Sequence, residues 1–305
     1  MKKRDKLQIV FLLITFIIAV VFCLVSFSRQ SEQEKALATL QQQEGEKEEE
    51  IKKAQDTLAD LEKQYEQQKR EQEKAQENGD TVTETEEKEP ENGKKVAIDP
   101  GHQGSNVDMS AMEPIGPGSG EMKMKSTGGT TGQFTGVPES ELNLNISKQL
   151  RTELEKRGYE VVLTREDQDT AISNKERALL AAESGADIYV RIHANGSEDS
   201  SANGAMTMVP SKENPYVSTL ADSSYLLGQC IIDDYCNATG IRNNGVQLYD
   251  NMSGINWSRI PVTILEMGFM TNQSDDENME KPEFQVKMVQ GIADGIEEYF
   301  QQSGE

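Results

Sequence analysis

Residues 187–195 read DIYVRIHAN, an apolar run typical of a β-strand that ends in a histidine and leads into a polar loop. Residues 96–102, VAIDPGH, repeat this pattern, and His102 and His193 are the only two histidines in the chain. Strands alternate with helices in the surrounding sequence, which is typical of an α/β domain. In such folds ligands bind in the crevice at the carboxyl ends of the strands. We therefore expect both imidazoles to lie in one crevice.

The regular elements predicted after residue 93 support this fold class. The predicted strands cover residues 96–99, 159–163, 187–192, 205–209 and 261–266. The predicted helices cover residues 139–157, 173–185, 217–239 and 282–301. Residues 103–137 show no periodicity, and a loop of this length is typical of a lid or a substrate-binding loop. We expect residues 94–305 to form one α/β domain with an open, largely parallel or mixed sheet flanked by helices.

The N-terminus is predicted to be a membrane anchor. Residues 9–27 are almost wholly apolar, and a helix of this length spans about 28 Å, close to the hydrocarbon thickness of a bilayer. The preceding MKKRDK is basic, so residues 1–28 are predicted to be a cytoplasmic tip and a single-pass transmembrane helix in the cell membrane. The remaining chain is then extracytoplasmic. Secretion after signal cleavage is the alternative, although no small-x-small cleavage site follows the apolar run.

Two segments are predicted to lie between this anchor and the folded domain. Residues 29–78 are rich in Glu, Lys and Gln and carry a weak heptad pattern, which predicts a helical or weakly coiled-coil stalk. A spacer is its expected role, and a protein partner or self-association through residues 31–78 is the alternative. Residues 79–93 have almost no apolar residues, which is typical of a disordered linker.

The charge of the chain excludes one class of partner. The formal net charge is −22 at pH 7, and so acidic a surface repels the phosphate backbone of nucleic acids. We expect no nucleic-acid partner, and the acidity is expected to serve solubility.

The two histidines predict a zinc site with two further carboxylates. A catalytic zinc site needs three protein ligands, an open position for water, and a group that accepts the water proton. Glu139, in the first turn of its predicted helix, is the expected third ligand, because Glu141 lies on a different face of that helix. Glu266 ends the predicted strand 261–266 and is expected to accept the proton.

Each of these residues also has a purely structural interpretation. A lone histidine at a strand end is more often a hydrogen-bonded surface residue, but two at such sites favour a ligand pair. Taken alone, Glu139 can be explained as a negative charge that stabilises the N-terminus of a helix. Taken alone, Glu266 can be explained as an exposed residue at the end of a strand. We name four further candidates for orienting the ligands or contacting substrate: Asp99, Arg165, Arg191 and Asn195. Asp99 can orient an imidazole, but an Asp-Pro turn explains it about as well. For Arg165 and Arg191 ion pairs are an equal alternative to substrate contacts.

Five segments in order resemble zinc-dependent N-acetylmuramoyl-L-alanine amidases of the Amidase_3 type. They are IDPGH at 98–102, ESELNL at 139–144, Thr164-Arg165, IHAN at 192–195 and EMGFMTN at 266–272. The resemblance covers about residues 94–300 and implies an open α/β sheet flanked by helices. It also implies one zinc ion per catalytic domain, bound by His102, Glu139 and His193, with Glu266 catalytic. Two features depart from the usual pattern: Gln103-Gly104 replaces a Gly-Gly pair after the histidine, and the loop before Glu139 is long.

The resemblance implies a peptidoglycan hydrolase that cleaves the amide between N-acetylmuramic acid and the L-alanine of the stem peptide. Our expectation is therefore an active wall amidase tethered to the membrane, with peptidoglycan as its substrate. A non-catalytic wall-binding or regulatory protein that keeps the fold is the first alternative, although no ligand or base is missing. A membrane-anchored coiled-coil scaffold with a passenger domain is the second.

Overall fold

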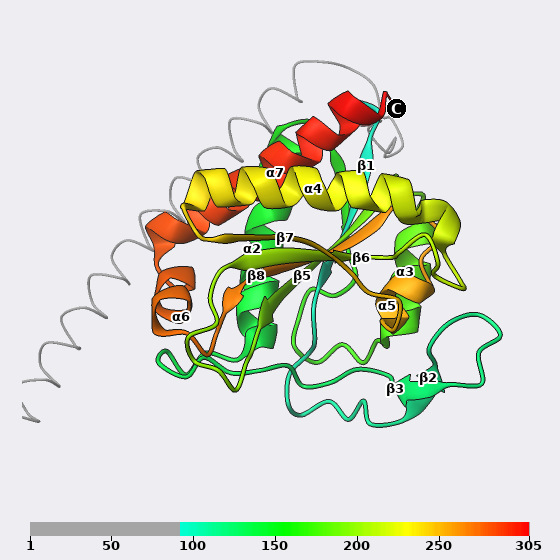
Figure 1. Ribbon diagram of the computed structural model, residues 1–305, viewed down its shortest axis with the longest axis horizontal. Coiled ribbons are helices and arrows are strands. Elements are labelled where there is room, and N and C mark those ends of the chain that lie inside the picture. The colour runs from blue at the N-terminus through cyan, green and yellow to red at the C-terminus, as the bar shows by residue number, and fades with distance from the viewer. Residues whose placement is uncertain (1–91, 305) are drawn as a thin grey trace, which may run out of the picture. The chain divides into compact units, whose positions relative to one another are not determined.

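The structure is a computed structural model that describes residues 92–304 (Figure 1). The predicted anchor, the predicted stalk and nearly all of the predicted linker lie outside the described residues. Within residues 92–304 no helix has the combination of length and apolar character that a membrane span requires.

Six strands of the described region form one mixed sheet in the order β4-β1-β5-β8-β6-β7. The strands are β1 Lys95–Pro100, β4 Glu160–Leu163, β5 Ile188–Asn195, β6 Ala205–Val209, β7 Asn243–Leu248 and β8 Val262–Phe269. Strand β6 runs antiparallel to β8, and the other neighbouring pairs are parallel. The predicted α/β class is thus confirmed, and the sheet is of the mixed kind.

Helices cover both faces of this sheet (Figure 1). The helical elements are α2 Glu139–Lys156, α3 Asn174–Glu183, the 3₁₀ turn Ser218–Leu220, α4 Ala221–Thr239, α5 Ser253–Asn256, α6 Gln273–Met279 and α7 Pro282–Ser303. The apolar faces of α2, α4 and α7 form one hydrophobic core with the sheet. Helices α3 and α5 form a smaller core with it on the other face.

The two-residue period of the strands decides which side chains enter which core. In β5, Ile188, Val190 and Ile192 join the larger core, whereas Tyr189 joins the smaller one. Because alternate side chains share a face of a strand, Arg191 and His193 follow Tyr189 on the side of α3 and α5. This face is therefore apolar near the start of β5 and polar toward its carboxyl end.

Local sequence signals mark where the helices begin and end. Ser173 and Glu176 form the reciprocal hydrogen bonds of a capping box at the start of α3, and each satisfies a backbone N–H that the helix leaves free. Gly240 ends α4 in the left-handed conformation, with φ of 75°. Helices α4 and α7 pack closely, because a Cβ atom built on Gly295 would lie 2.5 Å from Ile231 Cα.

Several short elements were not predicted. The loop 103–137 contains an antiparallel pair, β2 Met112–Pro114 and β3 Met122–Met124, and neither is long enough to show alternation. Strand β7 is largely polar, and α6 lacks an apolar stripe because its sequence is QSDDENM. Their positions depend on contacts with the rest of the domain rather than on local periodicity.

Candidate metal centre

The register of the sheet brings the predicted site residues to the carboxyl end of its central strands. His193 lies on β5, opposite Glu266 on the neighbouring parallel strand β8. Pro100, the last residue of β1, lies opposite Ile192, so the turn that follows carries His102 alongside His193. Neighbouring strands are about 4.8 Å apart, and the three side chains therefore share one edge of the sheet.

Three donor atoms converge at this edge: His102 Nε2, His193 Nδ1 and Glu139 Oε1. Glu139 Oε1 lies 3.0 Å from His102 Nε2 and 3.2 Å from His193 Nδ1, and the two nitrogens are 3.2 Å apart. Tetrahedral ligands about 2.0 Å from a zinc ion are separated by about 3.3 Å. This three-donor cluster therefore has the size and chemistry of three corners of a tetrahedral zinc site.

The hydrogen bonds of His102 orient its ring toward the cluster. Its Nδ1 lies 2.8 Å from the carbonyl oxygen of Thr127. A carbonyl only accepts hydrogen bonds, so Nδ1 carries a proton, and Nε2 is the ring nitrogen left to bind a metal. The backbone of His102 is left-handed, with φ of 61°, a conformation uncommon outside glycine and frequent at functional sites.

Glu139 is held in place by groups from three parts of the chain. Its Oε1 accepts hydrogen bonds from the backbone N–H of Ala194 and from Asn143 Nδ2, and its Oε2 accepts one from the backbone N–H of Thr130. Burial alone would raise the pKa of this carboxyl, but its hydrogen bonds with His102 and His193 hold it well below its usual value. The carboxylate is therefore ionised and ready to bind a cation.

His193 is buried and neutral. Burial is the main cause that lowers the pKa of its imidazole to about 4, despite the opposing hydrogen bond with Glu139. Its Nε2 has no hydrogen-bond partner in the described residues. Gly101 makes room for the ring, because a Cβ atom there would lie 2.2 Å from His193 Cε1. The neutral imidazole is the form that binds metals.

Glu266 lies beside the cluster without joining it. Burial raises the pKa of its carboxyl to about 8, and the nearby charge of Glu139 acts in the same direction. Its Oε2 is buried and has no hydrogen-bond partner in the described residues. A buried carboxyl with a pKa near neutrality is suited to accept and return a proton.

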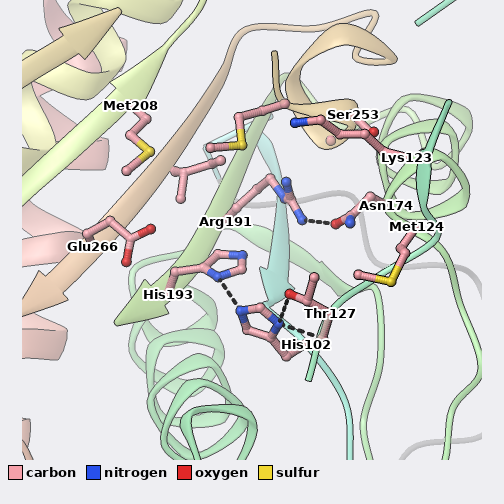
Figure 2. Close-up of a pocket in the computed structure, with 13 residues that line it drawn as sticks. His102, Lys123, Met124, Thr127, Asn174, Arg191, His193, Met208, Ser253 and Glu266 are labelled. Carbon is pink, nitrogen blue, oxygen red and sulfur yellow. Dashed lines mark hydrogen bonds between the residues drawn. The ribbon is translucent and has the colours of Figure 1, made fainter. Parts of the chain in front are cut away.

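The cluster and Glu266 open onto one pocket, of about 350 Å³ (Figure 2). Its lining comes from the turn after β1, from β3 and the loop after it, from the start of α3, from β5, β6 and β8, and from the segment around α5. The lining residues are His102, Lys123, Met124, Thr127, Asn174, Arg191, His193, Met208, Met252, Ser253, Gly254, Ile264 and Glu266. The predicted role of loop 103–137 in substrate contact is thus consistent with its position.

Of the four further candidates, Asp99 differs most from expectation. One of its two expected roles was to orient an imidazole. Its carboxylate instead accepts hydrogen bonds from Thr164, Arg177 and Arg191, and in the described region it bonds to neither histidine. Strand register is the reason, because Asp99 lies opposite Arg191 rather than His193. Asp99 therefore holds buried arginines, and the interpretation as an imidazole partner is wrong.

Arg165 and Asn195 do not line the pocket. Arg165 is buried and donates to the carbonyl oxygens of Pro100, Gly101 and Ser140, so it joins the turn of His102 to the start of α2. Asn195 Oδ1 accepts a hydrogen bond from the N–H of Gly196. Arg191 alone among the four reaches the pocket.

Sequence reasoning missed two residues that shape the site. Arg177 is fully buried on α3 and donates to the carbonyl oxygen of His102. Its place beside the buried alanines of α3 was the available signal, since an arginine on an apolar face requires partners. Asn143 donates to Glu139 Oε1 and to the carbonyl oxygen of Gly101, and the four-residue spacing from Glu139 along the helix could have indicated this.

Known proteins resemble this chain over the same region. The family model described as N-acetylmuramoyl-L-alanine amidase matches residues 96–298. N-acetylmuramoyl-L-alanine amidase LytC of Bacillus subtilis is 32% identical over 61% of this chain and 35% of its own length. Probable cell wall amidase LytH of Staphylococcus aureus is 29% identical over 71% of this chain and 62% of its own length. The chain thus spans less than two thirds of either relative.

The fold has a matching relative among solved structures. The crystal structure of the apo form of the N-acetylmuramyl-L-alanine amidase Ami1 from Mycobacterium abscessus superposes with a TM-score of 0.62 at 26% identity, over 68% of this chain and 99% of that one.

Proposed function

This chain belongs to the Amidase_3 family of N-acetylmuramoyl-L-alanine amidases, and we propose that it hydrolyses the amide bond between N-acetylmuramic acid and L-alanine in peptidoglycan. The three-donor cluster beside Glu266 supports this proposal most directly. Two imidazole nitrogens and one carboxylate oxygen, separated by 3.0–3.2 Å, are a ligand set that suits zinc. We propose one zinc ion per catalytic domain, held by His102, Glu139 and His193.

The residues around the cluster have separate roles in amide hydrolysis. Zinc, when bound, acts as a Lewis acid that polarises a carbonyl oxygen and lowers the pKa of a water molecule. Glu266 accepts the proton of the attacking water at Oε2 and donates it to the leaving nitrogen of L-alanine. Thr127 keeps the ring of His102 oriented throughout, and the buried contacts of Glu139 keep its carboxylate ionised.

Matched variants of two neighbouring acids test the ligand assignment. Glu139→Gln removes a proposed ligand, whereas Glu141→Gln changes an exposed acid two residues along the same helix. We expect Glu139→Gln to lose both bound zinc and release of stem peptides from purified sacculi, measured by metal analysis and mass spectrometry. Glu141→Gln should retain both. Equal zinc content in the two variants would contradict the assignment.

Glu266→Gln tests the proton-transfer role separately. Gln keeps the shape of the side chain but cannot accept a proton, so we expect zinc to bind and hydrolysis to fall by at least a hundredfold, as is typical of loss of a general base (about 10²–10⁴). Full activity in this variant would refute the role of Glu266.

We further propose that residues 1–28 anchor the protein in the cell membrane with the catalytic domain on the peptidoglycan side. The apolar run 9–27 and its basic flank support this arrangement. Protease treatment of intact protoplasts should remove the catalytic domain from the membrane fraction. Recovery of the domain in the culture medium with its N-terminus cleaved would instead support secretion.

A further inference from the structure

Arg191 presents an unused hydrogen-bond donor to the pocket. Its side chain is 4% exposed, its Nε donates to Asp99 at 2.7 Å, and its Nη2 donates to Asn174 Oδ1 at 2.6 Å. In the described residues its Nη1 makes no hydrogen bond, and it lies over Gly254, where a Cβ atom would approach it to 1.9 Å. Arg191 and Gly254 both line the pocket. Nη1 does not belong to the fully buried side-chain atoms of the described residues that lack a partner. It is therefore reachable from the pocket, and a bound ligand can supply its acceptor.

The positive charge around Arg191 also exceeds the negative charge that it contacts. Asp99 is the one carboxylate bonded to Arg191, and it is shared with Arg177, whose Nη1 lies 2.7 Å from Asp99 Oδ1. Within residues 92–304 no hydrogen bond joins Arg191 to Glu266. Two buried guanidinium groups therefore share one buried carboxylate, and a buried charge without a partner is unfavourable.

The other polar groups at this end of the pocket are donors or can donate. Figure 2 shows Lys123, Asn174 and Ser253 grouped on the far side of Arg191 from Glu266. We refer to Lys123, Asn174, Arg191 and Ser253 as the donor end. Glu266 is the one carboxylate of the pocket lining and lies at the opposite end. A pocket end with two cations and no carboxylate is complementary to an anion.

The distance from the donor end to the three-donor cluster matches a short piece of peptide. Arg191 and His193 are two residues apart on one face of β5, which places them about 7 Å apart along the strand. An extended peptide advances about 3.3–3.6 Å per residue. A carboxylate on the second amino acid after the scissile amide therefore lies about 7 Å from the scissile carbonyl carbon.

From these observations we infer that the donor end binds the α-carboxylate of the second stem-peptide residue, a γ-linked glutamate. This inference rests on the proposed amidase function. Arg191 Nη1 and the Asn174 amide donate hydrogen bonds to the carboxylate, the Ser253 hydroxyl adds a third, and Lys123 contributes charge from β3. Arg191 thus determines specificity: the pocket discriminates stem peptides with a free carboxylate from those in which this group is an uncharged amide.

The test compares two substrates that differ only in that group. They are N-acetylmuramoyl-L-Ala-γ-D-Glu-L-Lys and the same tripeptide with the glutamate α-carboxylate amidated, each incubated with the full-length zinc-loaded protein. We expect kcat/KM for the free carboxylate to exceed that for the amide by about ten- to a hundredfold, as for hydrogen bonds to charged groups. The ratio is the readout, because losses of zinc or stability affect both substrates equally.

Variants then assign the preference to the donor end. Arg191→Gln should bring the ratio close to one, and Arg191→Lys, which keeps a charge, should retain part of it. Lys123→Glu should lower the ratio, whereas Lys125→Ala, on the same loop but outside the pocket lining, should leave it unchanged.

The outcomes separate this inference from the proposed function. Failure to cleave sacculi and both tripeptides would refute the amidase function, and the inference with it. Equal cleavage of both tripeptides by the wild type, or an unchanged ratio in Arg191→Gln, would overturn only the carboxylate subsite. If Arg191→Gln does not fold, Lys123→Glu decides, and an unchanged ratio in that variant overturns the subsite.

Discussion

Glu266→Gln should stabilise the zinc-free protein, and the gain should grow with pH. The pKa of Glu266 is raised from 4.5 to about 8 in the folded state because the carboxyl is buried. A folded-state pKa above the unfolded value means that the folded protein holds the proton more tightly. The contribution of protonated Glu266 to the free energy of unfolding is therefore at its maximum below pH 4.5, and it is lost as the pH rises to about 8.

The size of the effect follows from the shift. One pKa unit corresponds to about 1.4 kcal/mol. Between pH 4.5 and pH 7 the wild type loses about 3 kcal/mol of unfolding free energy through Glu266, and by pH 8 about 4 kcal/mol. Gln has no proton to lose, so the Glu266→Gln protein escapes this loss, and its advantage should rise by about 1.4 kcal/mol per pH unit.

Urea denaturation of the chelator-treated proteins at pH 5, 6, 7 and 8 measures this difference. Trp257, the single tryptophan of the chain, offers a fluorescence signal, and far-UV circular dichroism gives an independent one. Glu141→Gln, a change at an exposed acid, is the control for loss of a surface charge. A difference between wild type and Glu266→Gln that stays constant or falls between pH 5 and pH 8 would refute the argument.

Three further substitutions test packing around the site and in the core. Gly101→Ala places a Cβ atom 2.2 Å from the ring of His193, so we expect at least a tenfold loss in zinc affinity, measured by competition with a chelator, while circular dichroism stays native. Gly295→Ala forces α4 and α7 apart and should lower the free energy of unfolding by about 1–3 kcal/mol, measured by urea denaturation. Gly120→Ala, with open space around it, should lower it far less. Equal losses in the two variants would show that the helix contact is unimportant. Asp99→Ala leaves two buried guanidinium groups without their carboxylate and should cost about 3–5 kcal/mol by the same measurement; a loss below 1 kcal/mol would contradict this.

Much of the fold was predictable because its signals are local. The apolar runs ending at His102 and His193, the stripe of α7 and the stop at Gly240 depend on residues within one or two turns or strands. These patterns place chain segments in strands or helices. The same patterns, together with the family resemblance, selected His102, Glu139, His193 and Glu266, and the structure brings all four to one pocket or its edge.

The sequence by itself therefore determined the α/β class, the main elements and the four residues that carry the proposed chemistry. Only the tertiary structure decided which imidazole nitrogens face Glu139, that Asp99 serves arginines, and that Arg191 rather than Arg165 opens onto the pocket. The physical reason is that these contacts join residues as many as 92 positions apart. Strand register and side-chain packing select such partners, and the local periodicity of the sequence does not indicate them.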